Sequence, residues 1–191
     1  MDEYMQNELK KSVEVLRSGG ILLYPTDTVW GLGCDATNES AVKRVFEIKK
    51  RIDAKAMFVL VDGPSKIQAY VDEIPDLAWD LIEMSEKPLT IIYPKAKNLA
   101  KNLIAEDGSI GIRVTKEVFS RSLCFQFRKP IVSTSANVSG DSTPANFIQI
   151  SDEIKSTVDY IVHFRHEELS NPKPSSVIKL DKGNIFQLIR E

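Results

Sequence analysis

Polar side chains that can bind small charged molecules follow apolar segments at three places in this chain. Tyr24–Gly33, after the apolar run Ile21–Leu23, carries two threonines, an aspartate and a tryptophan. Ser133–Gly140, after Ile131–Val132, is rich in serine and asparagine. Between them, a segment of helical periodicity ends in Ile48–Arg51, which holds three cations in a row. Open α/β sheets hold ligands at strand ends, and neighbouring Lys and Arg side chains can bind one polyphosphate. These residues therefore favour positioning of polar substrates and neutralisation of phosphate charge.

Each of the three segments also has an ordinary structural explanation. Cations at the end of a helix complement its dipole, which accounts for Lys49 and Arg51 without any ligand. Serine and asparagine favour turns because their side chains bond to the local backbone. A buried strand that runs into a turn needs no function. Considered one at a time, the segments leave both interpretations open.

Other well-known catalytic patterns are missing from the sequence. It contains no Gly-x4-Gly-Lys-Ser/Thr, so a bound ATP would not be held by a P-loop. His163 and His166 lie in an expected strand and its exit, and no cysteine is near them, which argues against a zinc site. The absence of Gly-x-Ser-x-Gly argues against a serine hydrolase. Hydroxyl, amide and cationic groups are left to carry the chemistry.

The elements that must position these residues follow from hydrophobic periodicity. Apolar residues at helical spacing predict helices over about Gln6–Arg17, Lys116–Phe127 and Ile148–Val158. Continuous or alternating apolar runs, such as Ile21–Tyr24 and Ile110–Val114, predict strands. About seven strands are expected to interleave with about five helices. The expected fold class is α/β (α+β by strict classification), with a single open twisted mixed β-sheet and helices packed on it.

Length and composition predict a single domain over residues 1–191 with an ordinary hydrophobic core. The chain is 42% apolar and 27% charged, and its net charge of −2 gives no overall attraction to nucleic acid. Cys34 and Cys124 are expected to be free thiols in a reducing compartment. The sequence has no apolar run of about 18 residues and begins with acidic, polar residues. We therefore expect no membrane span and a cytoplasmic location.

Taken together, the three segments resemble a known family. PTDTVWGLG, KKR and STSANVSG, in this order and at these separations, are similar to the motifs of the YrdC-type threonylcarbamoyl-AMP synthases in their short, single-domain form. The likeness runs from about Gly19 to Arg190. It implies a YrdC/RibB-like fold, in which one sheet curves around a concave functional face.

The resemblance also implies a reaction. The chain would be an L-threonylcarbamoyladenylate synthase, a nucleotidyltransferase that makes threonylcarbamoyl-AMP and pyrophosphate from L-threonine, bicarbonate and ATP. The product would serve threonylcarbamoyladenosine modification of tRNA, and a separate downstream threonylcarbamoyl transferase would complete that modification. Mg²⁺, bound with ATP, is the implied cofactor.

The resemblance assigns residues to two substrates. Lys49 and Arg51 match the catalytic, nucleotide-binding pair of the family. Further nucleotide contacts are implied for Ser109, Ser133, Asn137 and Arg190, and Asn137 would also be able to hold Mg²⁺ through its oxygen or a water. The implied L-threonine-binding residues are Thr26, Thr28, Arg113, Ser135 and Ser175.

Arg113 also stands out without the resemblance, because an arginine on a central strand needs a partner. The family pairs it with the threonine carboxylate. The chain departs from the family pattern at Ile52 and Ala56, where prolines are usual, and at Ser176, where threonine is usual. Trp30 stands where tyrosine is common in the family. The tryptophan side chain keeps a flat apolar ring and one hydrogen-bond donor, but it lacks the hydroxyl of tyrosine as an acceptor.

Three other functions remain open for the sequence. A non-catalytic double-stranded RNA or tRNA-binding module would use Lys49, Lys50, Arg51 and Lys55 for phosphate contacts. A carbamoyl-transfer domain of hydrogenase-maturation proteins shares these motifs, but occurs in much longer chains with acylphosphatase and zinc-finger segments. A sugar-phosphate enzyme such as dihydroxybutanone-phosphate synthase would need a cluster of acidic metal ligands, which the sequence does not display.

Overall fold

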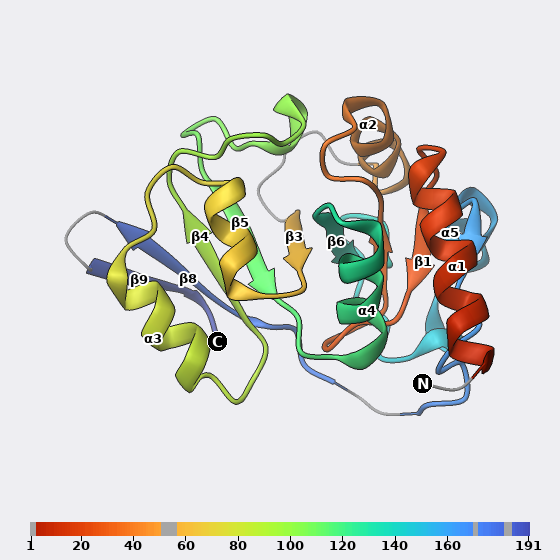
Figure 1. Ribbon diagram of the computed structural model, residues 1–191. Coiled ribbons are helices and arrows are strands. Elements are labelled where there is room, and N and C mark those ends of the chain that lie inside the picture. Colours follow the sequence, from red (N-terminus) through yellow and green to blue (C-terminus); the bar gives the residue numbers. More distant parts are fainter. Residues whose placement is uncertain (1–2, 51–56, 170–171, 182–184) are drawn as a thin grey trace.

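The computed structural model describes residues 3–50, 57–169, 172–181 and 185–191, and nine strands lie within these ranges. They are β1 (Leu22–Tyr24), β2 (Gly31–Gly33), β3 (Phe58–Val61), β4 (Leu89–Tyr93), β5 (Ile110–Val114), β6 (Ile131–Ser135), β7 (Tyr160–Ile161), β8 (Ser176–Asp181) and β9 (Ile185–Arg190). All nine form one sheet in the order β7-β1-β2-β6-β3-β5-β4-β8-β9 (Figure 1). Its neighbouring strands are parallel in some pairs and antiparallel in others, so the expected open mixed sheet is confirmed.

The described residues form nine strands instead of about seven, and β2 is a strand that the sequence does not predict. It consists of Gly-Leu-Gly and is hydrogen-bonded between β1 and β6. A Cβ atom at Gly33 would lie 2.5 Å from the Tyr24 ring and 2.9 Å from the Val132 carbonyl oxygen. Glycine therefore belongs here because its neighbours come too close for a side chain, although glycines in sequence usually indicate a turn.

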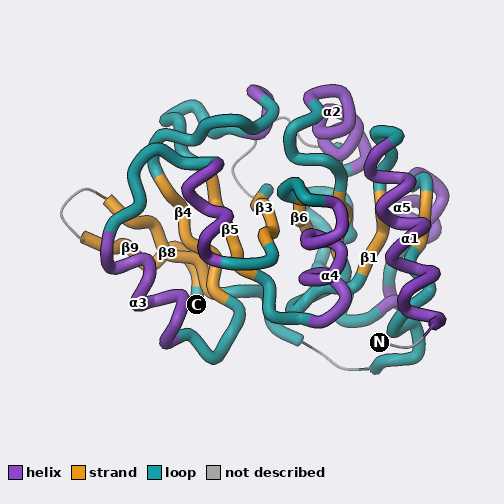
Figure 2. The backbone as a smooth tube through the Cα atoms, viewed as in Figure 1, coloured by secondary structure: helices purple, strands orange, loops and turns teal. Residues whose placement is uncertain are grey.

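The helices are α1 (Glu3–Arg17), α2 (Glu39–Ile48), α3 (Asp76–Met84), α4 (Val118–Phe127) and α5 (Asp152–Thr157), with three 3₁₀ turns, η1 (Pro64–Ala69), η2 (Lys101–Leu103) and η3 (Phe147–Gln149). The predicted helix over Ile148–Val158 is divided into η3 and the shorter α5. Ser151 causes the division, because its extended backbone and its hydroxyl, which accepts from the Ile154 amide at 3.4 Å, make it the N-cap of α5. Figure 2 shows how the helices and loops surround the sheet.

Two apolar clusters cover opposite faces of the sheet. In one, α1 and α4 lie side by side (Figure 1) and pack on Leu22, Tyr24 and Leu60. In the other, α2 packs with Leu23 and Val59, which alternate with the first set along the same strands. Successive strand residues point to opposite faces, so this alternation explains the two-sided burial.

Helix α2 delivers Lys49 to the interior. Asn38 begins the helix, because its side chain accepts from the amides of Ser40 and Ala41 at 3.0 and 3.1 Å. Val42 and Val45 are fully buried and fix the rotation of the helix against the sheet. Lys49, as the C-cap, then extends from the end of α2 toward the turn that follows β6.

Two expectations from composition can be compared with the structure. Cys34 and Cys124 are both free and buried, and burial raises the pKa of each thiol. Among the described residues, no helix combines the length and the apolar character needed to cross a membrane.

Candidate active site

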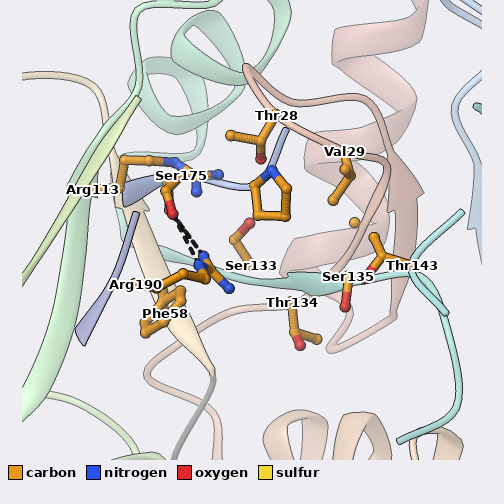
Figure 3. Close-up of a pocket in the computed structure, with 12 residues that line it drawn as sticks. Thr28, Val29, Phe58, Arg113, Ser133, Thr134, Ser135, Thr143, Ser175 and Arg190 are labelled. Carbon is orange, nitrogen blue, oxygen red and sulfur yellow. Dashed lines mark hydrogen bonds between the residues drawn. The ribbon is translucent and has the colours of Figure 1, made fainter. Parts of the chain in front are cut away.

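A cavity of about 90 Å³ lies over β2, β3, β5 and β6 and is bordered by the end of β9 (Figure 3). Its lining residues are Thr28, Val29, Gly31, Phe58, Arg113, Ser133, Thr134, Ser135, Thr143, Pro174, Ser175 and Arg190. Segments from the whole length of the chain therefore meet here. Six residues predicted from the sequence are among them: Thr28, Arg113, Ser133, Ser135, Ser175 and Arg190.

Strand register brings these residues to one face of the sheet. Phe58 of β3 pairs with both Gly111 of β5 and Ser133 of β6. Directly paired residues point to the same face, and so does Arg113, which is two residues beyond Gly111. A Cβ atom at Gly111 would lie 2.3 Å from the Phe58 ring, so this glycine leaves room for the ring in the cavity wall.

Arg113 is the buried cation of the cavity. Its side chain is only 4% exposed, and its Nη2 lies 3.1 Å from Oδ1 of Asp27, whose side chain is 10% exposed. Within the described residues, Arg113 Nε has no hydrogen-bond partner. A buried, unpaired donor on a cation in a cavity wall is well suited to an anionic ligand group, because leaving such a donor unsatisfied is costly.

Arg190 is the second cation of the cavity. Its Nε and Nη2 donate to the Ser175 carbonyl oxygen at 3.0 and 2.9 Å, which the dashed lines in Figure 3 mark. Ser175 is buried, and its hydroxyl is 2.8 Å from that of Thr90 on β4. Burial lowers the pKa of Arg190, and the nearby charge of Arg113 adds to the shift. The two positively charged guanidinium groups repel each other at one cavity, and a bound anion would offset this repulsion.

Thr26 and Thr28 shape the loop between β1 and β2. The Thr26 hydroxyl donates to the Val29 carbonyl at 2.8 Å and lies 3.1 Å from the Thr28 hydroxyl. Thr28 lines the cavity and Thr26 does not, but the Thr26 hydroxyl supports the loop by accepting from the Thr28 amide at 3.1 Å. Arg165 donates to the Thr26 carbonyl at 3.1 Å and so ties this loop to the segment after β7.

Lys49 lies beside the turn after β6, outside the lining of the cavity. It is 2% exposed, and its ammonium donates to the carbonyl oxygens of Ser135 and Asn137 at 2.6 and 2.8 Å. The Lys49 carbonyl also accepts from the Ser139 amide at 2.9 Å. Lys49 therefore holds the turn that carries two of the predicted binding residues.

The remaining predicted residues are not gathered in the cavity. Arg51 lies outside the described residues. The Ser109 hydroxyl donates to Asp107 at 2.5 Å, away from the cavity lining. The Asn137 amide donates to the carbonyls of Val138 and Asp141, both at 2.9 Å. The nucleotide-binding roles of Ser109, Asn137 and Arg51 stay predictions, as do the binding roles of the predicted residues that line the cavity.

Trp30 is a buried part of an aromatic cluster. Its ring centroid is 5.0 Å from that of Phe147 and 5.4 Å from that of His166, and the latter two rings are stacked. Burial lowers the pKa of His166. Trp30 therefore helps to join the first motif to η3 and to the segment after β7.

Several residues of the site escape sequence reasoning. Phe58, Thr143 and Pro174 line the cavity, but nothing in their local sequence distinguishes them from strand or loop residues. Asp27 and Arg165 act through ion pairs between distant segments. For Asp27 a signal existed, since it lies inside the first motif and is a carboxylate beside a buried strand.

Mg²⁺ has few protein ligands available at this site. The described residues contain no group of three or more His, Cys, Asp or Glu able to hold a metal. Asn137, in the turn after β6 and outside the cavity lining, has a buried Oδ1 without a hydrogen-bond partner among these residues, and one such oxygen fits a single Mg²⁺ ligand. Mg²⁺ commonly keeps its waters and binds substrate phosphates, so this donor set fits an ion that arrives with a nucleotide.

An open mixed α/β sheet with two arginines and several hydroxyls around one cavity defines a protein suited to binding a small anionic molecule. The chain belongs to the Sua5/YciO/YrdC family, since the model of that family, described as "Telomere recombination", matches residues 14–191.

Relatives agree with this assignment. The chain is 34% identical over 186 residues to the threonylcarbamoyl-AMP synthase of Pseudoalteromonas translucida (strain TAC 125), covering 95% of this chain and 98% of that protein. E. coli YciO superposes with a TM-score of 0.84 at 26% identity, covering 97% of this chain and 89% of that one. The YrdC-like fold is thereby confirmed.

P. abyssi Sua5 is a longer structural relative. A variant of it superposes with a TM-score of 0.85 at 25% identity, covering 95% of this chain and 55% of that one. A structure of it complexed with L-threonine gives 0.79 at 25% identity, with 90% and 50% covered. The chain thus spans about half the length of P. abyssi Sua5.

Proposed function

We propose that this protein is an L-threonylcarbamoyladenylate synthase. It would join L-threonine, bicarbonate and ATP into threonylcarbamoyl-AMP and pyrophosphate, which makes it a nucleotidyltransferase. The product would serve threonylcarbamoyladenosine formation in tRNA through a separate downstream transferase. Family membership supports this proposal, and so does the name threonylcarbamoyl-AMP synthase of a relative matched along nearly its whole length.

One observation carries the proposal, namely the environment of Arg113. A guanidinium with an unpaired Nε, buried among hydroxyl groups in a small cavity, suits the carboxylate of an amino acid. Thr28 and Ser135 offer donors and acceptors for polar groups, and Val29 offers an apolar contact for a methyl group. A related protein, P. abyssi Sua5, is described in complex with L-threonine, which has these groups.

The reaction proceeds through a carbamate. Bicarbonate takes up a proton and loses water to give carbon dioxide, and the unprotonated amine of L-threonine attacks its carbon. A C–N bond forms and the amine proton leaves to solvent. A carbamate oxygen then attacks the α-phosphorus of ATP, the bond to the β-phosphate oxygen breaks, and pyrophosphate departs. Both steps depend on holding the reacting groups together and on excluding bulk water, since carbamates decompose in it.

Charge stabilisation is the second task of the site. Negative charge grows on the leaving phosphate oxygens, so cations that lie close to them favour the transition state over the ground state. Arg190, with the predicted pair Lys49 and Arg51, would supply these charges. Ser133 and Asn137 would bind phosphate oxygens, with the Asn137 oxygen toward Mg²⁺. When bound to ATP, Mg²⁺ neutralises part of the phosphate charge.

The proposal is tested by following the carbon of bicarbonate. The purified chain would be incubated with ¹⁴C-bicarbonate, ATP and Mg²⁺, with or without L-threonine, and the nucleotides separated at once. We expect label in a new adenylate only when L-threonine is present, with one threonine per AMP. ATP consumption without any labelled adenylate would contradict the proposed reaction.

A further inference from the structure

Among the described residues, Asp27 is the only carboxylate within ion-pair distance of Arg113, and the two belong to different parts of the fold. Arg113 projects from β5, where it pairs with Thr90 of β4 and Leu60 of β3. Asp27 comes from the loop between β1 and β2. With 4% and 10% of their side chains exposed, the two charges are almost fully removed from water. An unpaired charge buried to this extent would carry a large desolvation cost, so each of the two groups stabilises the other in its buried position.

The ion pair between Arg113 and Asp27 has one close nitrogen–oxygen contact and is not bidentate. Nη2 of Arg113 lies 3.1 Å from Oδ1 of Asp27. Within the described residues, neither that Oδ1 nor Arg113 Nε has a partner with hydrogen-bond geometry. A carboxylate bound as a fork to one edge of the guanidinium would form two parallel hydrogen bonds and leave fewer donors for a ligand. This arrangement balances the charge of Arg113 while its remaining donors stay available.

The Arg113 side chain that carries these donors lines the cavity. Figure 3 shows the Arg113 guanidinium on the side of the cavity where Ser175 and Thr28 also lie. Arg190 brings a second positive charge to the same cavity, and the two guanidinium groups repel each other. Asp27 balances the charge of Arg113 through their ion pair, and it also borders a neighbouring cavity with Ile112 and Glu117.

The Asp27 loop is itself held in place. Arg165 donates to the carbonyl of Thr26 at 3.1 Å and lies 3.6 Å from Glu117, the N-cap of α4. The carboxylate of Asp27 is therefore presented to Arg113 by a loop fixed on its other side. Groups with fixed neighbours lose less freedom when they bind a ligand.

We propose that Asp27 is a positioning residue: it fixes the Arg113 guanidinium so that its unpaired edge faces the cavity and meets the carboxylate of the bound amino acid. Asp27 itself does not touch the amino acid in this account. The inference rests on the proposed function, because it takes L-threonine as the ligand of Arg113.

A double-mutant cycle tests the inference. The affinity for L-threonine would be measured by isothermal titration calorimetry on the full chain, with α,β-methylene-ATP and Mg²⁺ present and bicarbonate absent. The variants are Asp27→Asn, Arg113→Met and their combination. We expect Asp27→Asn to weaken binding by about tenfold, which is about 1.4 kcal/mol. On the Arg113→Met background, the same change should alter affinity by less than about twofold, since Asp27 would have nothing left to position.

Asp35→Asn is the matched control. Asp35 is also a buried aspartate in an ion pair, 2.7 Å from Lys129, but it lies outside the cavity. It should leave L-threonine affinity unchanged. If Asp27→Asn weakened L-threonine binding equally in the wild-type and Arg113→Met backgrounds, the inference would be overturned. A general structural role of Asp27 would lower the affinity by the same factor whether or not Arg113 is present. Unchanged affinity in Asp27→Asn would overturn it too.

Two further outcomes are distinguishable. If Asp27→Asn does not fold, Asp27→Glu keeps the charge and displaces it by one methylene. A positioning role predicts several-fold weaker L-threonine binding for Asp27→Glu and no effect on the Arg113→Met background, whereas unchanged affinity overturns the inference. If the wild-type chain does not bind L-threonine at all, the proposed function fails, and the inference that rests on it fails with it.

Discussion

Lys49 is the residue for which the sequence and the structure suggest different roles. The sequence places it in a cationic run and the family resemblance makes it a phosphate ligand. In the structure its ammonium is buried and donates to two carbonyl oxygens of the turn after β6. Its positive charge is still close to that turn, so it can favour a nearby phosphate while its hydrogen bonds shape the backbone.

Replacement of Lys49 by methionine should therefore damage stability as well as activity. The substitution removes the ammonium donor from the carbonyls of Ser135 and Asn137, and the Ser135 carbonyl then keeps the Asn137 amide, 2.9 Å away, as a donor. A buried group left unsatisfied costs about 1–3 kcal/mol. We expect the free energy of unfolding in urea to fall by about 2 kcal/mol or more, and pyrophosphate release to fall at least about tenfold.

Lys43→Met is the control for this experiment, since Lys43 lies on the same helix with 75% of its side chain exposed and only a 3.8 Å contact to Glu47. Its unfolding free energy should change by less than about 0.5 kcal/mol. Equal stability of both variants and wild type would show that Lys49 does not hold the turn.

Individual site residues were predictable where a motif carried them. Thr28 follows β1, and Ser133 and Ser135 belong to β6; the sequence marks both segments with hydroxyls, and all three residues line the cavity. Phe58 and Thr143 were not predictable, because their place in the cavity depends on strand order and loop path. The role of Asp27 depends on a partner 86 positions away, which no local pattern reveals.

Among the elements, β2 shows that glycines required by close packing in a strand can look like turn residues in the sequence. Gly33 lies between the Tyr24 ring and the Val132 carbonyl. The ring cannot swing aside easily, because Tyr24 is fully buried and its hydroxyl donates to Val132 O at 3.1 Å. Periodicity identifies apolar strands such as β5, but a Gly-Leu-Gly strand has no apolar pattern to recognise.

Gly33→Ala should accordingly destabilise the sheet. The added methyl overlaps its neighbours, and overpacking of this kind costs about 1–3 kcal/mol. Thermal unfolding should show a lower midpoint, and activity should fall because β2 borders the cavity. Gly63→Ala is the control, since nothing lies within 4 Å of its Cβ position and it should unfold like wild type within about 0.5 kcal/mol. Equal midpoints for all three proteins would show that β2 tolerates a side chain.

A pH-dependent ion pair joins β8 to the turn before β5. Lys179 lies 2.7 Å from Asp107, and this hydrogen bond, with help from Ser109, lowers the pKa of Asp107 to about 2. A carboxyl whose folded pKa is lowered stabilises the fold above its usual pKa, near 4, and loses that contribution as the pH falls through about 2. The pair is half exposed, so the contribution is below about 1 kcal/mol.

Asp107→Asn should thus lower the free energy of unfolding at pH 7 by a few tenths of a kcal/mol and leave it unchanged near pH 2. Urea unfolding at both pH values measures the difference. Asp152→Asn is the control, because that carboxylate is fully exposed and its contact with Lys155 is long, at 4.0 Å. A loss for Asp107→Asn that is as large at pH 2 as at pH 7 would contradict the ion-pair explanation.

At the scale of the whole molecule, the distribution of charge bears on the RNA-binding alternative. Many surface cations are paired with carboxylates within 4 Å, and examples are Lys43–Glu47, Arg44–Asp159, Lys50–Glu153, Lys97–Asp72 and Lys129–Asp35. Paired cations release fewer counterions when they meet phosphates. The net charge of −2 adds no long-range attraction.

We therefore expect weak binding to double-stranded RNA. Fluorescence anisotropy with a labelled duplex should give a Kd no tighter than about 1 μM at about 150 mM salt. The Lys50→Glu variant serves as a comparison, since it should change this weak binding little. Tighter binding with a steep salt dependence would favour the non-catalytic RNA-binding module.

Pyrophosphate release from ATP by the purified chain tests most sharply whether the cavity binds L-threonine beside the nucleotide, and it would be measured with Mg²⁺ and bicarbonate in the presence of L-threonine, of L-serine or of neither. We expect release that depends on L-threonine, is weaker with L-serine because L-serine lacks the methyl group that would contact Val29, and is abolished when Arg113 is replaced by alanine. Release that is the same without any amino acid, or that survives in Arg113→Ala, would contradict the claim that this cavity joins L-threonine to the nucleotide.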